Sequence, residues 1–146
     1  MILTTTPRLA ASAIALIVKE SGRKYALDRL MDWLAAEIAS VLAFSAVKNS
    51  DKVGLLLFTE KVELYVPPRK GRRHVLRIVR EVLGFEPANR GTNLVHALDF
   101  VNDVIERRAI VFLLSDFQAA NPTSESVADL RRALRQTNRR HDLVAL

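Results

Sequence analysis

Two near-continuous apolar runs of strand length constrain the fold of this chain more than any other feature. They are 53–59 (VGLLLFT) and 109–115 (AIVFLLS). A strand with only one buried face alternates apolar and polar residues, whereas an uninterrupted run needs cover on both faces, as in parallel sheets. Segments with helical periodicity separate the runs. The sequence therefore predicts an α/β fold with helices on both faces of a sheet.

The remaining elements follow from periodicity and turn residues. Four segments have apolar residues at helical spacing and are predicted to be helices: 28–48, 72–83, 94–106 and the segment that follows the turn 121–124 to about 135. Thr92 or Asn93 is the expected cap of the third helix. Three further segments are predicted to be strands: 9–18, 62–66 and 142–146.

The expected topology is a doubly wound, mainly parallel sheet with one antiparallel edge hairpin. The hairpin is predicted because only Glu60 and Lys61 separate the run 53–59 from the strand 62–66. Pro67-Pro68 is expected to end that strand. No helix follows the final strand, so the sheet is expected to look truncated at its C-terminal edge. Such an unpaired edge could associate with a second copy.

Length and composition bound the class of protein. The 146 residues suit a single domain, 1–146, with 1–13 as a lead-in of uncertain role. Composition is that of a globular protein, with 49% hydrophobic and 26% charged residues, and the absence of cysteine excludes disulfides and thiol chemistry. The longest apolar run, 9–18, is half the length of a membrane span. We expect a cytoplasmic protein, or one associated with a membrane through upstream sequence or a partner.

The net charge of +6 is concentrated in one stretch without carboxylates. Its six basic residues, here called the basic patch, are Arg69, Lys70, Arg72, Arg73, Arg77 and Arg80. A cationic helix face can neutralise phosphates, so a basic-surface binder of nucleic acid or another anionic partner is the alternative function. Tyr65 is the only aromatic residue nearby, which argues against nucleic acid. A second acid-free basic run covers 131–140.

The carboxyl edge of the predicted sheet is where a ligand would bind. Segments 19–23, 91–93 and 115–117 follow predicted strands or precede a helix there. They would bring together Ser21, Thr92 and Asp116, a cluster of oxygen donors of the kind that hard cations prefer.

The chain resembles bacterial von Willebrand A-like proteins of a family of unknown function, often encoded beside MoxR-type AAA+ ATPases. The resemblance covers roughly 14–146. The segments that carry it are 35–83, RGTNLVHAL, RRAIVFLLSDF and RRHDLVAL. It implies a von Willebrand A fold with a metal-ion-dependent adhesion site at the carboxyl edge. Family members build that site from an Asp-x-Ser-x-Ser turn, a threonine and a later aspartate.

This sequence departs from the family pattern where the metal would bind. By the resemblance, Lys19 stands at the first Asp, Ser21 at the first Ser and Arg23 at the second Ser, while Thr92 and Asp116 match the other two positions. Cations at two of five positions disfavour Mg²⁺ or Mn²⁺, and no cofactor is expected. The residual candidate ligands are Ser21, Thr92 and Asp116.

Two hypotheses address Lys19. In one, it pairs with Asp116 and substitutes a fixed charge for the ion; in the other, it is a solvated strand end. A further hypothesis is that Lys19 and Arg23 attract a carboxylate of a partner without metal.

Other residue types give no catalytic site. His74, His96 and His141 lack ligand spacing and are expected at helix surfaces or strand ends. No nucleophile with its base and no phosphate loop occurs, and Trp33 is expected in the core. The sequence thus favours a non-enzymatic protein–protein interaction module with a degenerate adhesion site, and the resemblance implies a MoxR-type AAA+ ATPase as the partner.

Overall fold

The computed structural model describes residues 13–19, 26–88, 91–115 and 124–146. Five strands form one sheet in the order β3-β2-β1-β4-β5. The strands are β1 (Ala13–Lys19), β2 (Lys52–Phe58), β3 (Val62–Arg69), β4 (Ile110–Leu114) and β5 (Asp142–Ala145). The helices are α1 (Ala26–Lys48), α2 (Arg72–Gly84), α3 (Leu94–Val104) and α4 (Ser124–Arg140).

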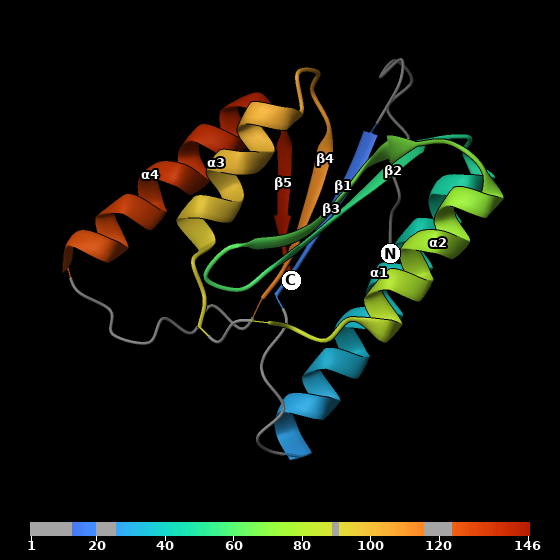
Figure 1. Cartoon of the computed structure of the whole chain (residues 1–146). Coiled ribbons are helices and arrows are strands. Elements are labelled where there is room, and N and C mark those ends of the chain that lie inside the picture. The colour runs from blue at the N-terminus through green and yellow to red at the C-terminus, as the bar shows by residue number, and fades with distance from the viewer. Residues whose placement is uncertain (1–12, 20–25, 89–90, 116–123) are drawn as a thin grey trace.

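The sheet is mainly parallel with one antiparallel edge. β1 pairs in parallel with both β2 and β4, and β4 pairs in parallel with β5. β3 is antiparallel to β2 and forms one edge, while β5 forms the other. Helices α1 and α2 cover one face of the sheet, and α3 and α4 cover the opposite face (Figure 1). The α/β prediction is confirmed.

The apolar run in β2 is explained by these two helical layers. Leu55 and Leu57 belong to the core that α1 and α2 cover, whereas Leu56 and Phe58 belong to the core under α3 and α4. All four side chains are at most 2% exposed. Burying such a side chain stabilises the fold by about 1.5–3 kcal/mol relative to leaving it in water.

The prediction that Pro67-Pro68 ends the strand 62–66 is wrong, because the corresponding strand β3 continues to Arg69. β3 is an edge strand, where a missing N–H can face outward without breaking the ladder. The pairing with β2 is irregular between Val53 and Leu55, opposite the prolines. Gly54 provides the space, since a Cβ there would lie 2.9 Å from Cγ of Pro68.

Helix ends differ modestly from the expectation. Of the two candidate caps of α3, Asn93 is the one observed, and its side chain accepts a hydrogen bond from the N–H of His96 over 3.0 Å. α4 continues beyond Arg135 to Arg140. The polar stretch at its end remains helical because Thr137 is buried and its hydroxyl accepts a hydrogen bond from Nδ2 of Asn102 over 2.9 Å.

The expectation that Trp33 lies in the core is wrong, since its side chain is 59% exposed. The inward face of α1 is lined instead by small residues, Ala36, Ala39, Ala43 and Ala46. Alanines let the helix lie close to the sheet and leave no room for an indole ring there. Across the residues that the structure describes, no helix is long and apolar enough to cross a membrane.

Candidate functional site

The carboxyl ends of three central strands lie together at one edge of the sheet. Lys19, the last residue of β1, pairs in register with Phe58 at the end of β2. Val18 pairs with Leu114 at the end of β4. In open parallel sheets, ligands bind at this edge, outside the strand ends. Of the loops that adjoin these three ends, the structure describes the one after β2, while the segments 20–25 and 116–123 lie outside the described residues.

The loop before α3 is held against the end of β2. The backbone N–H of Asn93 donates to the carbonyl oxygen of Thr59 over 2.9 Å. Gly91 has a φ of 103°, which favours glycine. A Cβ at Gly91 would also lie 2.7 Å from Oε1 of Glu60. These contacts bring Thr92, which is half-buried, to the carboxyl edge.

A carboxylate that the sequence analysis did not single out organises the same region. Glu63 on β3 accepts a hydrogen bond from Oγ1 of Thr59 at 2.5 Å, and its other oxygen accepts from the N–H of Ala88 at 2.8 Å. It thereby ties the end of β2 to the chain that follows α2. Glu63 occupies the polar position of the alternating strand 62–66, but its partner Ala88 lies 25 residues away, which no local pattern reveals.

The five adhesion-site positions are only partly described. Thr92 lies at the carboxyl edge, and the backbone of Lys19 ends β1 there. Ser21, Arg23 and Asp116 lie outside the described residues. The predicted cluster of Ser21, Thr92 and Asp116, and the pairing of Lys19 with Asp116, therefore stay predictions.

The described side chains of this edge do not fit a divalent cation. Both carboxylate oxygens of Glu63 are engaged in hydrogen bonds. Thr92 and Glu60 offer three further side-chain oxygens, whereas Mg²⁺ and Mn²⁺ take six ligands. Within the described ranges, no group of three histidine, aspartate or glutamate residues could hold a metal ion.

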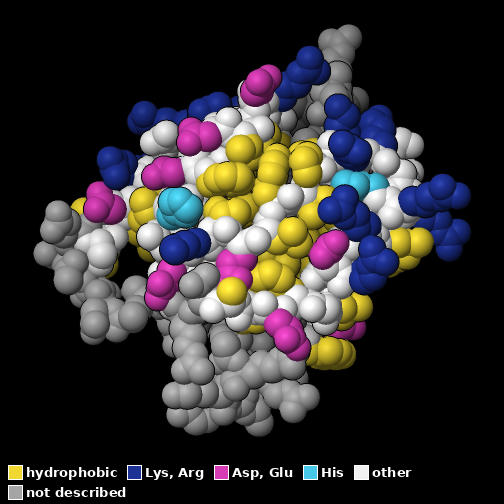
Figure 2. Space-filling view, viewed as in Figure 1, with side chains coloured by type: hydrophobic (Ala, Val, Ile, Leu, Met, Phe, Trp, Pro, Cys, Tyr) yellow, Lys and Arg dark blue, Asp and Glu magenta, His cyan; other side chains and the backbone are white. Residues whose placement is uncertain are grey.

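The basic patch begins at the opposite edge of the sheet. Arg69 pairs with Val53 at the start of β2, and all six side chains of the patch are exposed. Figure 2 shows lysine and arginine side chains gathered on the side of the molecule that α2 forms. Arg77 has a nearby carboxylate, Glu81, at 3.5 Å. The patch and the candidate site are thus separate surfaces.

The three histidines occupy different environments. His96 is exposed, and Nε2 of His74 lies 2.8 Å from the carbonyl oxygen of Val53, which fixes the start of α2 on β2. His141 joins α4 to β5 and is only 1% exposed, and neither ring nitrogen has a hydrogen-bond partner among the residues that the structure describes. Burial lowers the pKa of His141, and the positive charges of Arg140 and Arg108 lower it further.

The sequence matches over residues 10–146 the family described as "Protein of unknown function DUF58". No curated protein matches the chain significantly.

Solved structures resemble the fold at low sequence identity. The von Willebrand factor type A protein from Catenulispora acidiphila has a TM-score of 0.66 and 17% identity, with 93% of this chain covered. Proximal thread matrix protein 1 from the mussel byssus has a TM-score of 0.66 and 15% identity over 92% of the chain. BatB from Bacteroides thetaiotaomicron has a TM-score of 0.62 and 13% identity over 92%.

These likenesses establish a von Willebrand A-like fold, as the family resemblance implied. The chain spans 33% of the Catenulispora protein, 37% of the byssus protein and 65% of BatB. Another structure of the byssus protein is described as having a "zinc occupied MIDAS motif".

Proposed function

Because the chain belongs to the DUF58 family and has a von Willebrand A-like fold, we propose that it is a non-enzymatic protein-interaction module that binds its partner without a metal ion. The observation that carries this proposal is the position of Lys19. It ends the central strand β1, in register with Phe58 and close to the loop that holds Thr92. A cation at this position makes the edge attractive to a carboxylate of a partner and unattractive to a metal.

The byssus protein differs from this chain in the charge of the ligand expected at the adhesion motif. That protein is described with zinc in its adhesion motif, whereas in this chain two of the five positions that the family resemblance assigns to such a site, Lys19 and Arg23, are cationic. In the proposed mode, the carboxylate that a partner would offer to the ion is bound by the fixed charges directly. Arginine adds geometric specificity, because its guanidinium can form two parallel hydrogen bonds with one carboxylate.

Metal titration tests the first half of the proposal. We expect calorimetry with Mg²⁺ or Mn²⁺ to show no stoichiometric binding to the wild-type chain. The double variant Lys19→Asp with Arg23→Ser restores the family's ligand types, and we expect it to gain metal binding. Stoichiometric binding by the wild type would contradict the proposal.

Charge reversal tests the second half. As the partner we propose a MoxR-type AAA+ ATPase, for which the domain would serve as an adaptor. In a pull-down, capture of a MoxR-type ATPase encoded beside this chain should be lost in the variant Lys19→Glu with Arg23→Glu, because both charges then repel the partner's carboxylate. A matched control, Arg73→Glu with Arg80→Glu, changes the net charge equally on α2. Equal loss in both variants, or unchanged capture in the first, would refute the proposed site.

The basic patch supports a second candidate function, the binding of an anionic partner. Its six exposed cations favour such binding (Figure 2). Tyr65 does not offer a free ring to a nucleic-acid base, since it packs edge-on against Phe100 with centroids 5.3 Å apart. Nucleic-acid binding requires a phosphate-driven affinity that falls steeply with salt, which a filter assay measures.

A further inference from the structure

The outward face of α4 carries a row of arginines that the fold does not use. A hollow of about 690 Å³ lies along this face, and within the described part of the chain its lining comes from α4 alone. The lining residues are Ala128, Arg131, Arg132, Arg135, Gln136, Arg139 and Arg140. They recur at three- and four-residue spacing and therefore share one side of the helix. The inward side of α4 is formed by other residues, among them the buried Ala133 and Thr137.

The arginines repel one another along the helix. Arg135 lies four residues from both Arg131 and Arg139 and three from Arg132, and like charges at these spacings destabilise a helix. Only Arg132, among the five as the structure describes them, has a carboxylate partner, Asp129 at 3.2 Å. The helix dipole favours cations in the last turn alone, which accounts for Arg139 and Arg140 but not for the three arginines before them.

We propose that this arginine face binds an acidic helical segment of a protein partner. Arg131, Arg135 and Arg139 form a row that is about 12 Å long along the helix axis, at the rise of 1.5 Å per residue, and that turns gradually around the helix. Glutamates spaced one helical turn apart on a partner helix would match the row, and each guanidinium can hold one carboxylate through two hydrogen bonds. This surface is separate from the carboxyl edge, so the inference does not depend on the proposed function.

Two observations favour an acidic protein segment over a nucleic acid. The hollow has no aromatic lining residue among those described, so bases would find no ring to stack on. The helix α3 packs against α4 and carries the exposed carboxylate of Asp103, with exposed Glu106 just beyond its end. Arg107 and Arg108, which follow Glu106, are exposed too, so the charge beyond α3 is mixed, and a short acidic helix needs only the row itself.

The test is fluorescence anisotropy with a labelled helical peptide of about 16 residues that carries glutamates at i and i+4, and with its glutamine copy. The variant with Arg131→Gln, Arg135→Gln and Arg139→Gln removes the row and keeps helix-forming side chains. The matched control with Lys48→Gln, Lys52→Gln and Lys61→Gln removes the same charge from exposed positions outside both the arginine row and the basic patch.

We expect the wild type to bind the glutamate peptide and not the glutamine copy. Affinity should fall at least about tenfold in the α4 variant and less than about twofold in the control. An equal loss in both variants would show that net charge alone is responsible and would overturn the inference. Absence of binding to the glutamate peptide would also overturn it, as would tighter binding of a DNA duplex of similar length at the same salt.

Discussion

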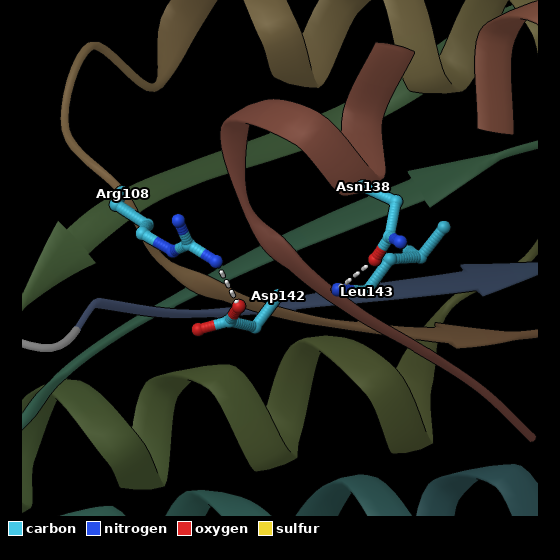
Figure 3. Close-up of polar contacts among 4 residues, drawn as sticks. All are labelled: Arg108, Asn138, Asp142 and Leu143. Atoms are coloured by element: carbon cyan, nitrogen blue, oxygen red, sulfur yellow. Dashed lines mark hydrogen bonds and ion pairs between the residues drawn. The ribbon is translucent and has the colours of Figure 1, made fainter. Parts of the chain in front are cut away.

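His141 is an ionisable side chain in surroundings that oppose its charge. It lies between the end of α4 and the start of β5 and is 1% exposed, and within the described part of the chain its ring nitrogens have no hydrogen-bond partner. Burial first, and then Arg140 and Arg108, lower its pKa, while Asp142 acts in the opposite direction. Its neighbourhood contains the exposed ion pair between Arg108 and Asp142, drawn in Figure 3. The neutral imidazole is thus the form that the folded state favours.

The lowered pKa predicts a loss of stability in mild acid. Below the ordinary pKa of 6.5 the unfolded chain binds a proton at His141 that the folded chain excludes, so the free energy of unfolding falls as pH falls. The slope for one such proton reaches at most about 1.4 kcal/mol per pH unit and ends at the lower pKa of the folded state. Urea unfolding between pH 7.5 and 5 measures it.

The variant His141→Leu is the control for this prediction. It removes the titrating group and should flatten the difference between the two pH values, whatever its absolute stability. Parallel pH profiles for the variant and the wild type would assign the effect to other groups.

At the scale of elements, β5 presents a sheet edge that is partly blocked. The backbone N–H groups of Asp142 and Leu146 donate inward, to carbonyl oxygens of Ala109 and Leu113. The N–H of Leu143 donates instead to Oδ1 of Asn138 on α4, over 3.4 Å (Figure 3). A side chain that occupies an outward N–H discourages another strand from adding to the edge.

Removal of this side-chain contact should promote association. In the variant Asn138→Ala the N–H of Leu143 becomes free, and sedimentation should show a mass that rises more steeply with concentration than in the wild type. Asn49→Ala, an exposed substitution beyond α1, is the control. If Asn138→Ala and the wild type sediment alike, the edge is protected by something other than Asn138.

Local sequence patterns predict elements well where burial alone decides them. The runs 53–59 and 109–115 appear as β2 and β4, close to the expected bounds, because both faces of each strand are covered. Elements that depend on distant residues were predicted less well. β3 extends past its prolines because Gly54 leaves room, and α4 extends past Arg135 because Thr137 finds Asn102.

In the candidate site, too, some features follow from the sequence pattern and others depend on contacts between distant residues. The carboxyl ends of β1, β2 and β4 share an edge, which strand order and parallel pairing determine. The contacts that shape the edge join residues far apart in sequence, such as Thr59 with Asn93, and no periodicity encodes them. Trp33 is predicted in the core because it is hydrophobic. Its side chain is exposed because the alanine face of α1 is the side of the helix that packs against the sheet.

At the scale of the whole molecule, the positive charge is divided between two faces of the sheet. The basic patch belongs to β3 and α2, and the arginine row belongs to α4 on the other face (Figure 1). A single flat partner cannot contact both. Of the 22 lysine and arginine residues, six form the basic patch and five line the arginine face of α4, so the chain carries two separate basic surfaces.

The strand order has a consequence for how the chain folds. From β1 the chain builds outward through β2 to β3, and only then crosses to the other side of β1 to add β4 and β5. During synthesis, β1, β2 and β3 can assemble under α1 and α2 before α3 and α4 have left the ribosome. Until those helices arrive, Leu56 and Phe58 have no cover on their side of the sheet. The half-built domain thus exposes an apolar surface that invites aggregation, and that exposure ends only when α3 and α4 pack against the sheet.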